Sequence, residues 1–293
     1  MDNGKPIVPV DFFLIGAAKS GTTWLSQCLG EHPEIAIAEG KEPNFFVDRA
    51  GIWGSARNRY FMSDWKDYSH VFRHAKPGQI RGDCSVNLFH NLNAPLIIAR
   101  HYPDAKLLVI LRNPMDRTYS HYWHERLFER CPGVPESFEE AISNPDLILR
   151  SRYFVQLSAW LACFHPSQVH VTLDLDLRSD SLAAISEVYR FLGVSTSFVP
   201  AAIGQRINAS LTRSRMLIAL ETVDRKIRHG PLARLPGMLG ELGVGRLVWK
   251  LTTRPNPYPP MNSDTRERLK EMLRPDIEQL RKLIGRDLGG WLA

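Results

Sequence analysis

A glycine-rich segment with the spacing Gly16-x4-Gly21 carries a single lysine, Lys19, and follows the apolar run Phe12–Ile15. This order predicts a buried strand, a loop and then a helix. In such a unit the loop amides and the helix N-terminus direct partial positive charge towards one point. The segment therefore predicts a site for a phosphate or a similar anion.

The loop differs from that of an ATPase or a kinase. The nucleotide loop G-x-x-x-x-G-K-[ST] has a lysine directly after its second glycine, where this chain has Thr22. A further apolar run, Lys106–Leu111, ends in Arg112 and not in an acidic metal ligand. The magnesium machinery of phosphoryl transfer is missing. We therefore keep a P-loop kinase or NTPase as an alternative only, and we predict no metal site.

Arg112 offers a second anion contact. At the carboxyl end of a strand in an open α/β sheet it would stand in the usual ligand crevice, and its planar fork suits a phosphate monoester. Pro114 is well placed to begin a helix over 115–130. Ser120 on that helix can face the same way and donate its hydroxyl. Arg117 is expected to be a solvated helix charge or the partner of a nearby acid.

The elements that must position these residues alternate along the chain. Apolar runs predict strands at 12–15, 79–85, 106–111 and 168–173, and helices at 24–29, 115–130, 150–164 and 181–192. Such alternation predicts an α/β fold with a central parallel sheet covered on both faces. We find no strand after Ile203, but we expect helices at 213–228 and 263–284. The prediction is a single domain over 1–293, with a core at 10–203 and a basic helical extension at 204–293.

Composition places the chain among ordinary globular proteins, with 44% hydrophobic and 23% charged residues. The positive charge is concentrated after residue 203, where the chain has 17 basic and 9 acidic residues. A basic protein that binds nucleic acid or a membrane surface is a further alternative. We find neither aromatic stacking platforms nor a recognition helix, so we predict no nucleic-acid partner. The segment 225–254 is both basic and apolar, and contact with an acidic or lipid-linked acceptor stays a hypothesis for it.

The loop and the arginine segment together resemble a known family. Residues 16–23 are similar to the 5′-phosphosulfate loop of sulfotransferases that use 3′-phosphoadenosine 5′-phosphosulfate (PAPS), above all the bacterial relatives of the heparan sulfate enzymes. Residues 111–120 resemble the 3′-phosphate motif of this family, and 205–213 resemble a loop over the nucleotide. The resemblance implies PAPS as donor, adenosine 3′,5′-bisphosphate (PAP) as product, and these contacts: Lys19, Ser20, Gly21, Thr22, Thr23, Trp24, Arg112, Ser120, Asn208, Ser210 and Arg213.

The segment 39–48 resembles the K-E-P-[HN]-F-F pattern of the same family, and this implies Glu42 as the general base. Nearby anions would raise the pKa of Glu42, which brings a carboxylate closer to a useful base. Lys41 and Lys19 would offset charge on the transferring group. Residues 81–87 and 152–160 also resemble family segments, although Asp83 replaces a glutamate and Cys84 stands where animal relatives have a lysine. The implied acceptor contacts are Lys41, Asn44, Asp48, Ser85 and Tyr153.

The resemblance extends to the C-terminus, where Trp291 is expected to dock the last helix. It implies an enzyme that moves a sulfuryl group to a hydroxyl or amine of a carbohydrate, or of a glycosylated or lipid metabolite. Because residues 1–11 show no signal-peptide pattern, we expect a cytoplasmic protein, with peripheral contact at the inner membrane face left open. Pairing of Cys131 with Cys163 and the oligomeric state are also left open.

Overall fold

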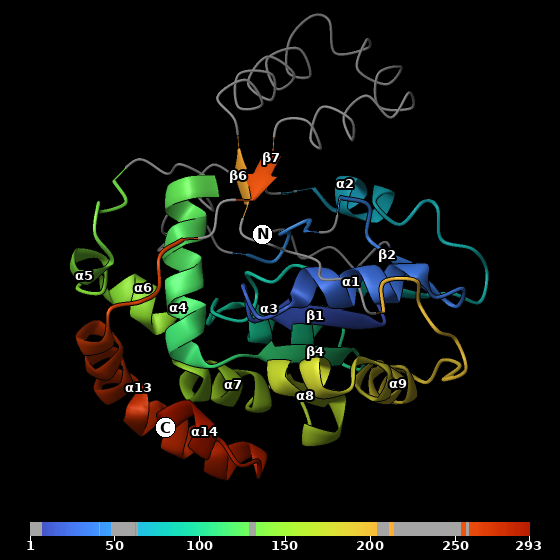
Figure 1. Cartoon of the computed structure of the whole chain (residues 1–293). Helices are drawn as coiled ribbons and strands as arrows, with labels where there is room; N and C mark the ends of the chain where they lie inside the picture. The colour runs from blue at the N-terminus through green and yellow to red at the C-terminus, as the bar shows by residue number, and fades with distance from the viewer. Residues whose placement is uncertain are drawn as a thin grey trace, which may run out of the picture.

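The computed structural model of this chain describes residues 8–40, 42–47, 62, 64–128, 133–203, 211–213, 253–255 and 258–293. Five parallel strands form the central sheet in the order β2-β3-β1-β4-β5 (Figure 1). They are β1 (Phe12–Gly16), β2 (Ile35–Ile37), β3 (Ile80–Asp83), β4 (Lys106–Leu111) and β5 (Val169–Leu173). The predicted α/β fold with a parallel sheet is confirmed.

The two central strands are almost entirely buried. All five residues of β1 are buried, and so are the last five residues of β4. Uniformly apolar strands are typical of a parallel sheet that has helices on both faces. The helices are α1 (Thr22–Glu31), α2 (Trp65–His70), α3 (Ala94–His101), α4 (Pro114–Trp123), α5 (Phe138–Ala141), α6 (Pro145–Leu149), α7 (Tyr153–Leu161), α8 (Asp174–Ser179), α9 (Ser181–Leu192), α13 (Ser263–Ile284) and α14 (Gly289–Leu292).

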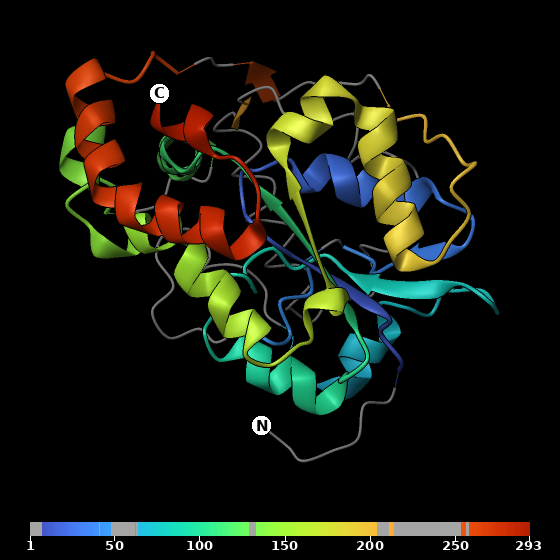
Figure 2. The same cartoon turned by 90° about the horizontal axis from the view of Figure 1, so that it is seen from below.

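The sheet separates the core into two layers, and helices cover both of its faces (Figure 2). On one face of the sheet α1 and α9 pack their leucine, isoleucine and valine side chains against β1 and β4. On the other face the larger cluster joins residues from α3, α4, α7 and α13. The C-terminal helix α13 lies against α7 and α4, and Trp291 is buried beside Tyr153 with 6.2 Å between ring centroids. The expected docking of the C-terminus by Trp291 is confirmed.

Several element boundaries differ from those that the sequence predicts. The helix expected at 115–130 is α4, which ends at Trp123 and continues as a π-helical turn, His124–Phe128. A short antiparallel pair, β6 (Leu211–Arg213) and β7 (Thr253–Pro255), corrects our prediction that no strand follows Ile203. Three-residue strands show too few alternations to be read from a sequence. The helix expected at 213–228 lies outside the described residues from 214 onwards.

The expectation for Arg117 is wrong. Its side chain is only 1% exposed. Its Nε donates to Ser151 Oγ at 2.6 Å, and its Nη2 donates to the Leu147 carbonyl at 3.3 Å. Burial lowers the pKa of Arg117 to about 10, which still leaves the guanidinium charged at neutral pH. Arg117 therefore fixes α4, the helix that follows Arg112, to its neighbours.

Three of the four cysteines, Cys28, Cys84 and Cys163, are free thiols. Cys131 lies outside the described residues, so its pairing stays open. Within the described ranges, no helix combines the length and the apolar character needed to cross a membrane.

A tight approach between β1 and β3 gives a stability prediction. Gly82 pairs with Phe12, whose ring is fully buried. A Cβ at Gly82 would lie 2.1 Å from Phe12 Cζ and would overlap this ring. We expect Gly82→Ala to lower the free energy of unfolding by about 1–3 kcal/mol, because the core is already filled. Gly290→Ala, where nothing lies within 4 Å, is the matched control. Equal urea midpoints for the two variants would contradict the prediction.

Candidate active site at the carboxyl end of the sheet

The glycine-rich segment forms a loop between β1 and α1. Gly21 adopts a left-handed conformation (φ 101°) as the residue that caps α1, and Lys19 is also left-handed (φ 73°). The loop is held by Ala17, whose amide donates to the Ile110 carbonyl of β4 at 2.8 Å. No acidic side chain lies in the first turn of α1. The N-terminus of α1 therefore offers its partial positive charge to an anion at the loop.

Arg112 lies beside this loop, at the end of the neighbouring strand β4. Its Nη1 donates to the Lys19 carbonyl at 3.3 Å, so the guanidinium touches the loop directly. The chain leaves β1 towards β2 on one side of the sheet and leaves β4 towards β5 on the other. Such a divergence between adjacent strands creates the ligand crevice of an open α/β sheet. The two features that the sequence predicts to bind anions are therefore in contact.

The helix that carries Ser120 begins where the sequence places it. Asn113 Oδ1 accepts hydrogen bonds from the amides of Met115 and Asp116, and Pro114 occupies the first helical position. Ser120 is buried on α4, at 8% exposure. Ser120 lies eight residues after Arg112, on the helix α4 that begins at the crevice.

Three other loop contacts predicted from the sequence are on α1 or directly before it. Ser20 and Thr22 are buried at 2% and 4% exposure. Trp24 packs in the core layer between α1 and α9, and its Nε1 donates to the Ala202 carbonyl at 3.1 Å. The ring of Trp24 thus links α1 to the end of the described core at residues 201–203.

The segment that carries Glu42 is fastened to the end of β3 through Asn44. The Asn44 amide donates to Ser85 Oγ at 2.9 Å, and its Nδ2 donates to the Glu42 carbonyl at 3.0 Å. Asn87 Nδ2 donates to Asn44 Oδ1 at 3.2 Å. Asn44 has φ 51°, a conformation that asparagine tolerates better than most residues. Asn44 and Ser85 are both buried, and they hold the Glu42 backbone in place.

Asp83 is a buried carboxylate at the end of β3. Its Oδ2 accepts from the Tyr68 hydroxyl and its Oδ1 from the Ser85 amide, each at 2.9 Å. Burial raises the pKa of Asp83 to about 6; the bonds from Ser85 and Tyr68 oppose this increase, and the charge of Glu42 adds to it. Glu42 therefore lies near a second carboxylate. In the sequence, Asp83 stood out only as the residue that replaces a glutamate of the family segment.

Tyr153 is fully buried near the glycine-rich loop. Its hydroxyl is close to Ser20, and its ring is 6.1 Å from that of Phe89. Burial raises the pKa of Tyr153 to about 12, although Arg117 and Arg112 oppose the increase, so the phenol stays protonated at neutral pH. The Tyr153 side chain therefore packs against the loop, and it has no exposed surface that an acceptor could contact.

Two histidines, His90 and His121, are buried near Arg150 and Arg117. Burial lowers the pKa values of His90 and His121 well below the usual range, and the charges of Arg150 and Arg117 lower both further. Lys19 also contributes to the lowered pKa of His121. Both imidazoles are therefore neutral at pH 7.

Some predicted contacts fall outside the described residues: Lys41, Asp48, Asn208 and Ser210. For Arg213 the structure describes the backbone in β6 alone. The segment 225–254 is described only at residues 253 and 254, in β7.

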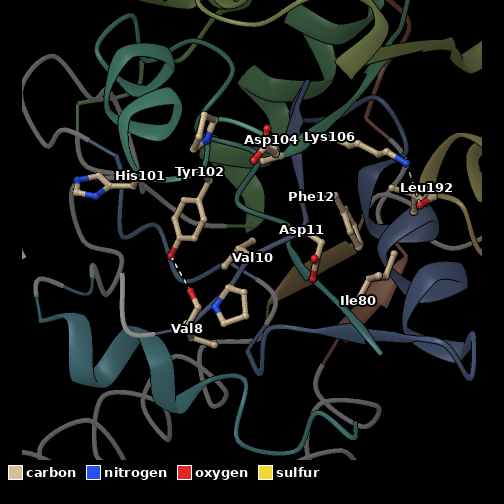
Figure 3. A pocket seen from close by; sticks show the side chains of 13 residues that line it. Val8, Val10, Asp11, Phe12, Ile80, His101, Tyr102, Asp104, Lys106 and Leu192 are labelled. Atoms are coloured by element: carbon tan, nitrogen blue, oxygen red, sulfur yellow. Dashed lines mark hydrogen bonds between the residues drawn. The ribbon is translucent and has the colours of Figure 1, made fainter. Parts of the chain in front are cut away.

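A cavity of about 530 Å³ opens at the opposite, amino edge of the sheet (Figure 3). Two of its polar side chains, Lys106 and Tyr102, already have hydrogen-bond partners within the chain. Lys106 Nζ donates to the carbonyls of Phe191 and Leu192, and the Tyr102 hydroxyl donates to the Val8 carbonyl. We therefore place the candidate active site at the carboxyl edge, where the glycine-rich loop and Arg112 are in contact.

Comparison with known proteins gives matches over nearly the whole chain. The family model described as sulfotransferase domain matches residues 9–216. Bifunctional heparan sulfate N-deacetylase/N-sulfotransferase 4 of Mus musculus is 30% identical over 300 residues, which cover 96% of this chain and 31% of that protein. Heparan sulfate glucosamine 3-O-sulfotransferase 6 of Mus musculus is 25% identical over 284 residues, covering 94% and 72%.

A solved structure of a sulfotransferase from Alicyclobacillus acidocaldarius has a TM-score of 0.70 and 25% identity, and the match covers 98% of this chain and 100% of that one. The chain spans about a third of the length of the bifunctional relatives that it matches, which also include the human N-deacetylase/N-sulfotransferase 3 (29% identical, 96% of this chain, 31% of that protein).

Proposed function

Because the chain belongs to the sulfotransferase domain family and is a sulfotransferase, we propose that it moves the sulfuryl group of PAPS to a hydroxyl or amine of a carbohydrate-containing acceptor. The observation that carries this proposal is the contact between Arg112 and the Lys19 carbonyl. It joins two anion-binding elements at one crevice, as a donor with a 5′-phosphosulfate and a separate 3′-phosphate requires.

The residues at the crevice fit such a nucleotide. Ser20 Oγ is buried and makes no hydrogen bond of normal geometry in the described part of the chain, so it can donate to a phosphate oxygen. Arg112 Nε is also buried without a hydrogen bond there. The loop amides, Lys19, Thr22 and Thr23 would hold the 5′-phosphosulfate, and Arg112 with Ser120 would hold the 3′-phosphate. PAPS supplies an activated sulfuryl group on a phosphate leaving group.

The chain's own residues would then do two kinds of work. Glu42 takes the proton from the acceptor, because a hydroxyl or ammonium group must lose a proton as it becomes bonded to sulfur. Lys19 and the N-terminus of α1 stabilise the negative charge that develops on the 5′-phosphate as it leaves. This assignment needs no metal ion, and metal independence stays a prediction.

The acceptor class is inferred from the relatives. Their names specify heparan sulfate and its glucosamine, with N-sulfation in one group and 3-O-sulfation in the other. These names support a saccharide acceptor for this chain and leave the choice between nitrogen and oxygen to experiment.

The test is transfer of label from [³⁵S]PAPS to matched oligosaccharides with free or N-acetylated glucosamine. Label on the free-amine form alone supports N-sulfation, and label on both supports O-sulfation. Binding of PAP without labelling of any saccharide would overturn the acceptor class. Turnover of ATP that depends on Mg²⁺, without PAP binding, would favour the kinase or NTPase alternative.

A further inference from the structure

Helix α8 lies next to the phosphate loop although no sequence motif singled it out. It follows β5 directly, and the side chain of Leu177 approaches Gly21, with its Cδ1 3.6 Å from where a Cβ of Gly21 would lie. The first residue of α8 is Asp174, so its carboxylate stands at the carboxyl edge of the sheet, where β5 ends beside β4.

Asp174 interacts with two arginines at once. Its Oδ2 lies 3.9 Å from Arg112 Nε and 2.9 Å from Arg178 Nη2. The side chains of Asp174 and Arg112 are 15% and 23% exposed, whereas that of Arg178 is 66% exposed. Burial raises the pKa of Asp174, and the two guanidinium charges oppose this increase.

The Arg112 guanidinium is thus approached on two sides. Nη1 donates to the Lys19 carbonyl at 3.3 Å, and Nε faces the carboxylate of Asp174. In the described part of the chain, neither contact uses Nη2. A planar guanidinium that donates to one carbonyl and lies beside a carboxylate is restricted in its orientation, and the N–H groups of Nη2 are then directed away from both contacts.

We propose that Asp174 is a positioning residue that orients Arg112 towards the 3′-phosphate of the donor. The inference rests on the proposed function, because it assigns Arg112 to that phosphate. Asp174 does not touch the reacting atoms. Arg178 shares its carboxylate, so the three side chains together keep a net charge of +1 and do not repel a phosphate.

If Asp174 only stabilised α8, its removal would affect the binding of both nucleotides and not that of PAP alone. An acidic residue in the first turn also favours the helix dipole, so its removal can loosen α8 as a whole. Asp176 provides the matched control, because it lies in the same first turn, accepts from the Leu173 amide at 3.0 Å and pairs with Arg286 at 2.7 Å.

The experiment is calorimetric binding of PAP and of adenosine 5′-phosphate, which lacks the 3′-phosphate, to the unmodified chain, Asp174→Asn and Asp176→Asn. We expect Asp174→Asn to weaken PAP binding about tenfold and to change adenosine 5′-phosphate binding less than about twofold. Asp176→Asn should leave the ratio of the two affinities unchanged. In an Arg112→Ala background, Asp174→Asn should have no further effect on PAP.

Equal losses for both nucleotides would reduce Asp174 to a structural residue, and tighter PAP binding would show that it competes with the phosphate. Either result overturns the proposal. Failure of the unmodified chain to bind PAP would instead overturn the donor assignment, and the role of Asp174 with it.

Discussion

Glu42→Gln is expected to reduce sulfuryl transfer to an identified acceptor by about 10²- to 10⁴-fold, the range that general-base catalysis contributes. Glutamine is nearly isosteric with glutamate but cannot take a proton. The backbone of residue 42 is held through Asn44 and Ser85, and these contacts do not involve the Glu42 carboxylate. The loss should therefore appear in kcat, whereas the affinity for PAP, measured by calorimetry, stays as it was.

The matched control is Glu39→Gln, three residues earlier. Glu39 is exposed, with its carboxylate 3.2 Å from Arg73 Nη2 and 3.6 Å from His74 Nδ1, on the surface of the same segment. Exposed ion pairs contribute little to stability, so this variant should transfer at the unmodified rate. A Glu42→Gln enzyme that is as fast as the Glu39→Gln enzyme would show that another group removes the acceptor proton.

The sequence motif did not explain the surroundings of Glu42. Asp83 is buried nearby with a pKa of about 6, and the charge of Glu42 contributes to this raised pKa of Asp83. The family pattern contained Glu42 and Asn44, but the bonds that place them come from Ser85 and Asn87, 41 and 43 residues further along the chain. Such separations cannot be read from local spacing.

The fold was predictable where the chain is uniformly apolar. β1 and β4 are buried on both faces, so their sequences are apolar throughout, and the parallel sheet followed from their alternation with helices. Prediction failed where the signal is short or the outcome depends on tertiary contacts. β2 has three residues, and Arg117 is buried only because Ser151 and the Leu147 carbonyl meet it across the fold.

Part of the candidate site was also predictable from the sequence, and part was not. Lys19 and Arg112 end up in contact because the carboxyl ends of adjacent parallel strands share one edge, which a strand-and-loop pattern already implies. Asp174 was missed, because acidic and basic residues alternating with leucines over 174–178 look like a solvated helix turn. Its partner Arg112 lies 62 positions earlier in the sequence, directly after β4.

Arg112→Ala is expected to weaken PAP binding by about 10- to 100-fold and adenosine 5′-phosphate binding by less than about threefold, since charge-assisted hydrogen bonds contribute about 1.5–3 kcal/mol. The difference arises because only PAP has the 3′-phosphate that Arg112 would bind. Arg112→Lys keeps the charge but loses the planar fork and the contact to the Lys19 carbonyl. The PAP affinity of this variant should therefore lie between that of the unmodified chain and that of Arg112→Ala. Calorimetry with both nucleotides measures each ratio directly.

Arg286→Ala is the matched control for charge. Arg286 pairs with Asp176 of α8, and its side chain is 46% exposed, so its loss removes a cation that contacts α8 without touching Arg112. A general decrease in positive potential would weaken PAP in both variants to a similar degree, and this weakening would disappear at high salt. A direct contact predicts a loss specific to Arg112 that persists at high salt. If Arg112→Ala weakened PAP and adenosine 5′-phosphate equally, Arg112 would act through the phosphate loop by way of the Lys19 carbonyl, and the 3′-phosphate would have to be bound by other residues.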